Sequence, residues 1–212
     1  MHSAPEGRQV IAEWAVRVCA HCGMKLQTLT GALALCAATA WGQAPVAPGA
    51  VPAPLSAIGE LSVERYMGRW YEIAKLPNWF QRKCVADTSA QYSLLPQGGV
   101  QVLNQCRLQS GEMEQALGLA QQQGGPQSPK LKVRFAPAWL SWLPVVWGDY
   151  WVIDLDPAYE LVAVSEPRRE YLWVLSRTPA VEPARYAALL ARLSAMGLPV
   201  DKLEPTRHTA PR

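Results

Sequence analysis

Residues 88–108 have the sequence TSAQYSLLPQGGVQVLNQCRL, in which two short runs of β-forming side chains flank a Pro-Gln-Gly-Gly turn. Proline and paired glycines supply the backbone angles of tight turns, so the stretch predicts a β-hairpin with strands at 88–95 and 100–108. Because only four residues join the two runs, they can pair only in the antiparallel sense. The sequence therefore predicts an antiparallel sheet around this hairpin.

The same pattern of short runs and turns continues on both sides of the hairpin. Strands are expected at 70–75, 88–95, 100–108, 113–120, 130–135, 149–155, 161–165 and 171–177. The connections leave no room for crossover helices, so each strand must pair with its neighbour in a meander. A meander has exposed edges unless it closes, and eight closed strands enclose space for one small ligand. We therefore predict an all-β fold, an eight-stranded antiparallel up-and-down barrel.

One amphipathic helix is expected after the last strand. Residues 182–196 repeat alanine and leucine at near-helical spacing, and Gly197 stands where a helix C-cap belongs. A single helix after eight strands should pack on the outside of the barrel. Residues 200–203 are expected to add a short strand.

The segment before the barrel has the features of an export signal. Residues 1–44 are interpreted as an N-terminal extension and signal peptide, with Met24 an alternative start and Gly42-Gln43-Ala44 a small-x-small cleavage site. A lipid anchor at Cys36 is disfavoured, because Leu35 rather than a small residue precedes it. Residues 45–60 form a Pro/Ala-rich linker, 61–204 the barrel domain and 205–212 a tail.

Composition and cysteine content agree with an exported binding protein. The charge of +3 is thinly spread, so no nucleic-acid partner is expected, and nine tryptophans suit pocket walls and membrane-facing lips. Once residues 1–44 are removed, Cys84 and Cys106 remain, and an even pair in an exported chain predicts one disulfide. Neither a metal nor another cofactor is expected, because Cys19-x-x-Cys22 has no second ligand pair at zinc-site spacing.

Several motifs resemble the lipocalin family, and within it the branch of bacterial lipocalins and apolipoprotein D. They are Gly68-Arg69-Trp70-Tyr71-Glu72, Leu76-Pro77-Asn78, Phe80, Val102-Leu103-Asn104 and Tyr171-Leu172-Trp173-Val174-Leu175-Ser176-Arg177. The resemblance spans residues 61–204. It implies that Gly68, Trp70 and Arg177 are structural residues at the closed base, where the guanidinium lies on the indole in a cation–π contact.

The resemblance also orients the barrel and suggests ligand contacts. Strand alternation counted back from Arg177 turns Trp173 inward, and matching family positions add Tyr92 and Asn104. Alternatively, the two aromatic residues fill the core and Asn104 satisfies a neighbouring backbone. The connections 76–87, 109–112, 136–148 and 166–170 would lie at the mouth, which brings Cys84 and Cys106 to the same end.

The mouth connections contain further candidate contacts. In 136–148, Trp139 and Trp142 would form an apolar lip that accepts a lipid tail or touches a membrane, unless they fold down as a lid. Arg168 would hold an anionic headgroup, although such a charge is often merely solvated.

We therefore expect a non-enzymatic carrier of a fatty acid or lysophospholipid, and the resemblance implies the periplasm, with association with the outer membrane an option. Two alternatives stay open. One is a lipocalin-like isomerase or synthase, for which Glu72 is the charged candidate. The other is an envelope interaction protein that uses the tryptophan loop as its interface.

Overall fold

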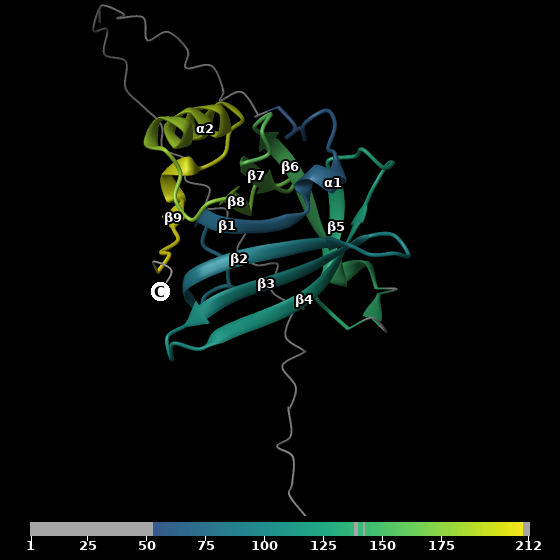
Figure 1. Ribbon diagram of the computed structural model, residues 1–212. Helices are drawn as coiled ribbons and strands as arrows, with labels where there is room; N and C mark the ends of the chain where they lie inside the picture. The colour runs from purple at the N-terminus through teal and green to yellow at the C-terminus, as the bar shows by residue number, and fades with distance from the viewer. Residues whose placement is uncertain (1–52, 138–139, 142, 210–212) are drawn as a thin grey trace, which may run out of the picture. The chain divides into compact units, whose positions relative to one another are not determined.

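Eight antiparallel strands close into a barrel in the computed structural model, which describes residues 53–137, 140–141 and 143–209 (Figure 1). The strands are β1 (Gly68–Lys75), β2 (Cys84–Leu94), β3 (Val100–Leu108), β4 (Met113–Gln122), β5 (Lys130–Arg134), β6 (Gly148–Leu155), β7 (Leu161–Ser165) and β8 (Leu172–Ser176). Each strand pairs with the next along the chain, and β1 pairs with both β2 and β8. The predicted meander and its closure are therefore confirmed.

The structure corrects the start of the second strand. β2 begins at Cys84, four residues before the expected position, and its first residues pair with the end of β3 through Cys84↔Leu108. The register shifts on either side of Ala86, next to Asp87, whose φ is +55°. Such an irregularity breaks the side-chain alternation from which a strand is predicted, because one extra residue reverses the facing of those that follow.

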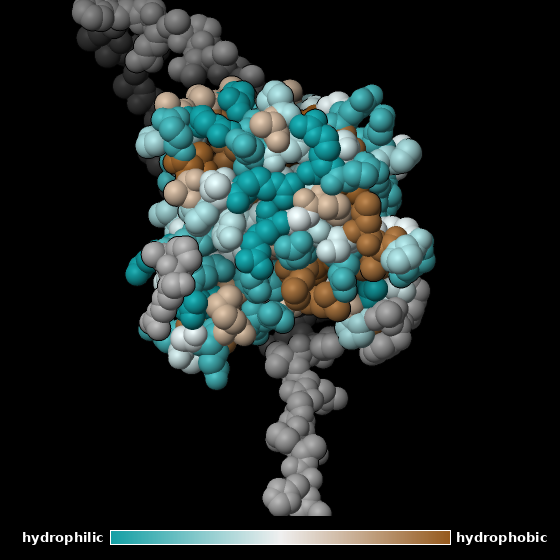
Figure 2. Space-filling view, in the orientation of Figure 1, coloured by the Kyte–Doolittle hydropathy of each residue, from teal (hydrophilic) through white to brown (hydrophobic). Residues whose placement is uncertain are grey.

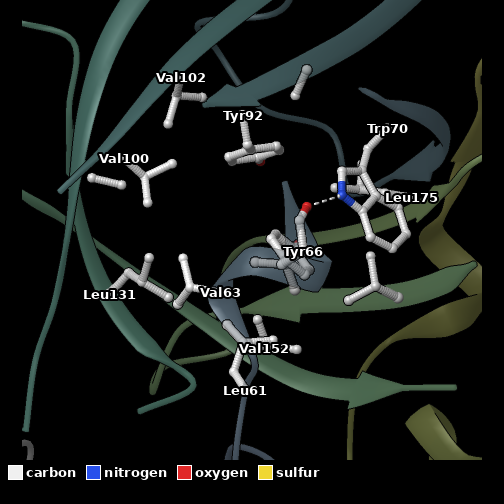
Figure 3. Packing of buried hydrophobic residues seen from close by; sticks show 14 residues of the cluster. Leu61, Val63, Tyr66, Trp70, Tyr92, Val100, Val102, Leu131, Val152 and Leu175 are labelled. Atoms are coloured by element: carbon white, nitrogen blue, oxygen red, sulfur yellow. Dashed lines mark hydrogen bonds between the residues drawn. The ribbon is translucent and has the colours of Figure 1, made fainter. Parts of the chain in front are cut away.

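A short helix precedes the barrel and was not expected. α1 (Val63–Tyr66) begins after Ser62, whose hydroxyl accepts from the Arg65 amide, and it buries Val63 and Tyr66. Figure 3 shows these two side chains among the inner residues of β1, β2 and β6. Four residues are too few for the helical period to be visible in a sequence.

The predicted C-terminal helix is confirmed on the outside of the barrel. α2 (Pro183–Ala195) is capped by Glu182, whose carboxylate accepts from the Ala184 and Arg185 amides at 2.9 and 2.8 Å. Its buried residues Leu189 and Leu193 pack against an outer cluster that β6, β7 and β8 supply. Figure 1 shows α2 along this side of the sheet.

The expected strand at 200–203 is wrong. Val200–Lys202 is a single 3-10 turn, and the strand β9 (Glu204–Pro205) follows it. β9 pairs with the end of β1 through Ala74↔Pro205, and beyond it the Thr206 amide donates to the Ile73 carbonyl at 2.9 Å. The Asp87 amide of β2 donates to the Arg207 carbonyl at 2.8 Å. Residues 205–207 of the expected tail thus lie beside β1 and β2.

Hydrophobic residues form two clusters separated by the barrel wall. The inner cluster includes Trp70, Tyr92, Val102, Val152 and Leu175, and the outer cluster lies under α2. Figure 2 shows one face of the molecule, which is largely hydrophilic with separate apolar patches. Within the residues that the structure describes, no helix is long and apolar enough to cross a membrane.

Candidate functional site

The closed end of the barrel is sealed by Trp70 and Arg177. The guanidinium carbon lies 3.9 Å from the centroid of the Trp70 ring, which is fully buried. The same guanidinium donates to the carbonyls of Arg65, Arg69 and Tyr159 at 2.8 to 3.1 Å. This is the arrangement expected at the closed base, and it engages Arg177 with Trp70 and three backbone carbonyls.

Gly68 is required beside this contact. Its φ is +98°, a region that side chains other than glycine rarely adopt, and a Cβ atom there would lie 3.2 Å from Nη1 of Arg177. Glycine thus lets β1 begin directly beneath the guanidinium. Gly68, Trp70 and Arg177 together form the floor.

Three tyrosines lie above this floor, inside the barrel. Tyr66 Oη is 2.7 Å from Tyr150 Oη, and Tyr92 Oη is 3.0 Å from the same atom. Burial raises the pKa of Tyr92 to about 12 and raises the pKa of Tyr66 and Tyr150 well above the ordinary value. The three residues, called here the tyrosine triad, therefore keep their protons at neutral pH.

The wall above the triad contains Asn104. It faces inward with Val100 and Val102, which belong to the inner cluster, because side chains alternate along β3. Its cross-strand partner Ala116 therefore faces inward too, yet Ala116 is exposed to solvent and Asn104 is only half-buried. Ala116 lies beyond the part of β4 that pairs with β5, Leu119–Gln122, so solvent reaches the inner face of the wall at this height. The interior is thus packed at the floor and open at the level of Asn104.

An aromatic ring covers part of this open wall. Gly118 lies on the inner face of β4, and a Cβ atom there would meet the ring of Phe135 at 2.7 Å. Phe135 itself is 43% exposed, so part of this side chain faces solvent. Glycine at 118 thus makes room for an aromatic surface inside the mouth.

Trp173 connects the inner wall to a mouth loop. It packs against the inner cluster, stacks on Tyr171 with centroids 5.8 Å apart and lies 6.2 Å from Phe80. Its indole N–H donates to Gln81 Oε1 at 2.9 Å. The N–H group of Trp173 is therefore already bonded within the protein.

Glu72 is buried in the same network. It is 2% exposed, and its carboxylate accepts from Gln81 Nε2 at 2.7 Å and from Thr206 Oγ1 at 2.6 Å. Burial raises the pKa of the Glu72 carboxyl, although these two hydrogen bonds oppose the shift. Neutral donors thus bond both carboxylate oxygens. Through these two hydrogen bonds, Glu72 joins β1 to the mouth loop at Gln81 and to the C-terminal segment at Thr206.

The predicted disulfide is confirmed at the mouth. Cys84 and Cys106 are bonded, with Cα atoms 5.5 Å apart, and join the start of β2 to the last residues of β3. Within the same region, Trp79 is 66% exposed and Val145 is 87% exposed. Large apolar side chains therefore face solvent from two of the mouth connections.

The remaining predicted contacts differ in their surroundings. Arg168 projects into solvent from the connection between β7 and β8, and its guanidinium lies 3.1 Å from Glu170 and 3.8 Å from Glu166. Its charge is thus already paired within its own hairpin. Trp139 and Trp142 lie outside the described residues.

Sequence reasoning missed Tyr66, Tyr150 and Phe135 in the interior. Tyr150 stands two residues before Val152 in the expected strand 149–155, so alternation carried through that strand would have turned both inward. Phe135 follows Leu131 and Val133 at the same spacing. No such signal exists for Tyr66, because it belongs to α1.

Comparison with known proteins gives consistent matches over the barrel. Residues 61–208 match the family model described as a lipocalin-like domain. The chain is 44% identical to temperature-induced lipocalin-1 of Arabidopsis thaliana, with 69% of this chain and 78% of the relative covered. It is 35% identical to the outer membrane lipoprotein Blc of Citrobacter freundii, with 72% and 82% covered, and 32% identical to apolipoprotein D of Mus musculus, with 68% and 75% covered.

Solved structures agree in fold. Insecticyanin from the tobacco hornworm Manduca sexta superposes with a TM-score of 0.55 at 18% identity, over 74% of this chain and 84% of that one. The cockroach allergen Per a 4 gives a TM-score of 0.54 at 20% identity, over 72% and 94%. At these identities, the likeness concerns the barrel fold alone.

Proposed function

Because this chain belongs to the lipocalin family, whose members bind small hydrophobic ligands, we propose that it carries a fatty acid or a lysophospholipid in the open half of its barrel. The observation that carries this proposal is the exposure of Ala116 on the inner face of β4, above a packed floor. An apolar chain that enters the mouth would replace water on this wall, which is favourable by roughly 25 cal/mol per Å² of apolar surface buried.

The wall supports an amphiphile more than a wholly apolar molecule. Its lower boundary is Tyr92, its sides are Asn104 and the face of Trp173, and Phe135 adds a ring near the mouth. The polar end of the ligand would remain at the rim. Arg82 is exposed there, whereas Arg168 must first leave Glu166 and Glu170 to bind an anionic headgroup.

The proposed setting is a bacterial cell envelope, on the periplasmic side of the outer membrane. Its support is the match to the outer membrane lipoproteins Blc of Citrobacter freundii and Vibrio cholerae, the latter 35% identical over 134 residues. The exposed Trp79 and Val145 support brief contact of the mouth with a membrane surface during ligand transfer. Flotation of the protein with phosphatidylglycerol vesicles, compared with a Trp79→Ser/Val145→Ser variant, tests that contact.

Binding without catalysis is part of the proposal. Among the described residues, the buried carboxylate of Glu72 is held by Gln81 and Thr206, and it presents no free oxygen to a substrate. Turnover would require Glu72 to leave both partners. The geometry thus supports a carrier over an isomerase or synthase.

The proposal is tested by native mass spectrometry of protein purified from the periplasm, followed by extraction and identification of the bound molecule. We expect a fatty acid or lysophospholipid in the wild-type protein and much less of it in Trp173→Leu. Trp151→Leu is the matched control, because Trp151 lies on the outer face beneath Lys130. Empty wild-type protein that also fails to bind added lipid would contradict the proposal.

A further inference from the structure

The tyrosine triad has one more proton than its own hydrogen bonds use. Each phenol carries one O–H, so the three residues have three donors, and the two contacts to Tyr150 use two of them. Among the described residues, no other hydrogen bond involves these hydroxyls. One O–H therefore remains for a partner from outside this part of the protein.

The spare proton belongs on Tyr150. Tyr66 and Tyr92 are 3% and 6% exposed, and both hydroxyls reach Tyr150, which is only half-buried. If both outer phenols donate to Tyr150, their protons are used and the Tyr150 proton is free to point elsewhere. Figure 3 shows Tyr66 and Tyr92 together among the buried residues of the inner cluster, with ring centroids 5.5 Å apart.

Tyr150 lies on the inner face of β6, next to the proposed binding wall. Gly148, two residues earlier on the same face of β6, is exposed, and its partner is the inner residue Val133. A molecule that lies along this wall would therefore reach Tyr150 at its deepest point. There the spare O–H must find an acceptor or remain unpaired, at a cost of about 1–3 kcal/mol.

We propose that the tyrosine triad is a recognition point for a neutral oxygen acceptor, such as a ketone, ester or hydroxyl oxygen, at the buried end of the ligand. This inference rests on the proposed function and makes it more specific. Among lipids of similar size, those with an oxygen atom near the inner end bind more tightly than those with a plain hydrocarbon end.

The surroundings favour a neutral acceptor over a carboxylate. The inner cluster around the triad consists of apolar and aromatic side chains, so an anion there would lose its water without gaining a cation. Arg177 lies over Trp70, and its donors are held by three backbone carbonyls. An uncharged oxygen loses much less solvation than a carboxylate and gains the one available donor.

A matched pair of probes tests the recognition point. 2-Acetylnaphthalene has a ketone where 2-isopropylnaphthalene has a branched hydrocarbon of similar shape. We would measure both dissociation constants by quenching of tryptophan fluorescence and correct them for partition into cyclohexane. After this correction the wild-type protein should prefer the ketone by at least about fivefold, because one neutral hydrogen bond contributes that much even net of the water it replaces.

Tyrosine variants give the control. Tyr66→Phe and Tyr92→Phe each remove one proton and one internal hydrogen bond, so each leaves a spare O–H and should keep the preference. The triple variant Tyr66→Phe/Tyr92→Phe/Tyr150→Phe has no O–H in the triad and should lose it. If both probes bind and the ratio is the same in the wild-type and triple variants, the recognition point is overturned while the carrier function stands.

A second measurement on the wild-type protein removes any dependence on how well the variants fold. The infrared carbonyl stretch of bound 2-acetylnaphthalene should lie at lower wavenumber than in cyclohexane, because a hydrogen bond weakens the C=O bond. A stretch unchanged from cyclohexane would overturn the inference. If the folded protein binds cis-parinaric acid but neither probe, the recognition point is overturned while the carrier function stands.

Discussion

The guanidinium of Arg177 lies 3.9 Å from the centre of the Trp70 ring and at the same time donates to three backbone carbonyls. These carbonyls come from the segment before β1, from β1 itself and from the connection before β7. Arg177, which follows β8, is thus bonded to α1 and the start of β1, 112 and 108 residues earlier in sequence, and to the connection before β7. The closed end of the barrel depends on this contact.

Arg177→Met should therefore destabilise the protein strongly. The variant keeps some packing on Trp70 but leaves the Arg65, Arg69 and Tyr159 carbonyls without their donor, and we expect a loss of about 2–4 kcal/mol in the free energy of unfolding. Urea denaturation followed by tryptophan fluorescence measures it. The control is Arg69→Met, an exposed arginine near the same floor, which should change stability by less than about 0.5 kcal/mol. If Arg177→Met loses no more unfolding free energy than Arg69→Met, the contacts of Arg177 do not stabilise the closed end and the prediction is contradicted.

Reduction of Cys84–Cys106 should destabilise the mouth end. The bond closes a loop with a sequence separation of 22, and the chain-entropy model gives about 3 kcal/mol for such a loop. We expect Cys84→Ser/Cys106→Ser to lower the unfolding free energy by up to that amount and to weaken lipid binding. Urea denaturation with and without reductant measures the first effect. The double variant should not respond to reductant, and a wild-type protein equally insensitive to it would contradict the prediction.

Glu72→Gln should make stability less dependent on pH. Burial raises the folded pKa of Glu72 above its ordinary value of 4.5, so the folded state holds the proton more tightly than the unfolded state. Its contribution is fully present below pH 4.5 and is lost as the pH rises through the folded pKa. A glutamine stays neutral, can accept from Gln81 and can donate to Thr206. Lys75 and His208 also lie near the carboxyl group and are unchanged in the variant.

Urea denaturation of Glu72→Gln and the wild-type protein at several pH values measures this effect. As the pH rises from 4 to 8, the unfolding free energy of Glu72→Gln should increase relative to that of the wild type. Glu72→Leu is the contrasting variant, because it leaves Gln81 and Thr206 without their acceptor and should be less stable at every pH. If the difference in unfolding free energy between Glu72→Gln and the wild type does not change with pH, the raised pKa of Glu72 is contradicted.

Alkaline pH should destabilise the protein through the tyrosine triad. The folded pKa values of Tyr66, Tyr92 and Tyr150 are raised, that of Tyr92 to about 12, so their contribution is present below pH 10 and is lost as the pH rises through the folded values. The triple phenylalanine variant should lose less stability than the wild type between pH 9 and pH 11.5. Thermal unfolding monitored by circular dichroism is the measurement, and parallel losses would exclude the triad as the cause.

Much of this structure follows from local sequence patterns. The runs of 100–108 and 161–165 coincide with β3 and β7 because turns bound both runs; the second is a short, almost continuous apolar run that is buried throughout. The inward position of Trp173 follows from alternation counted from Arg177, and the structure packs it against the inner cluster. The nearness of Cys84 and Cys106 follows from topology alone.

Other features depend on contacts that local patterns do not contain. α1 is a single turn, and Tyr66 reaches the interior only because the chain crosses the closed end before β1. The segment after β9 pairs through Thr206 and Arg207 with strands more than 100 residues earlier, and nothing in its own alternation predicts this. The open half of the barrel was expected from strand number, but its lining by Ala116 and Phe135 depends on Gly118 in the neighbouring wall.

The central claim is that a lipid occupies the open half of the barrel, and filling that space with a side chain tests it most directly. Ala116→Trp places an indole on the inner face of β4, whereas Leu117→Trp places the same group on the outer face one residue away. The measurement is the dissociation constant of a fluorescent fatty acid, cis-parinaric acid, for both variants and the wild type. We predict that Ala116→Trp binds at least tenfold more weakly while Leu117→Trp binds like the wild type. Equal binding by all three proteins would contradict the claim.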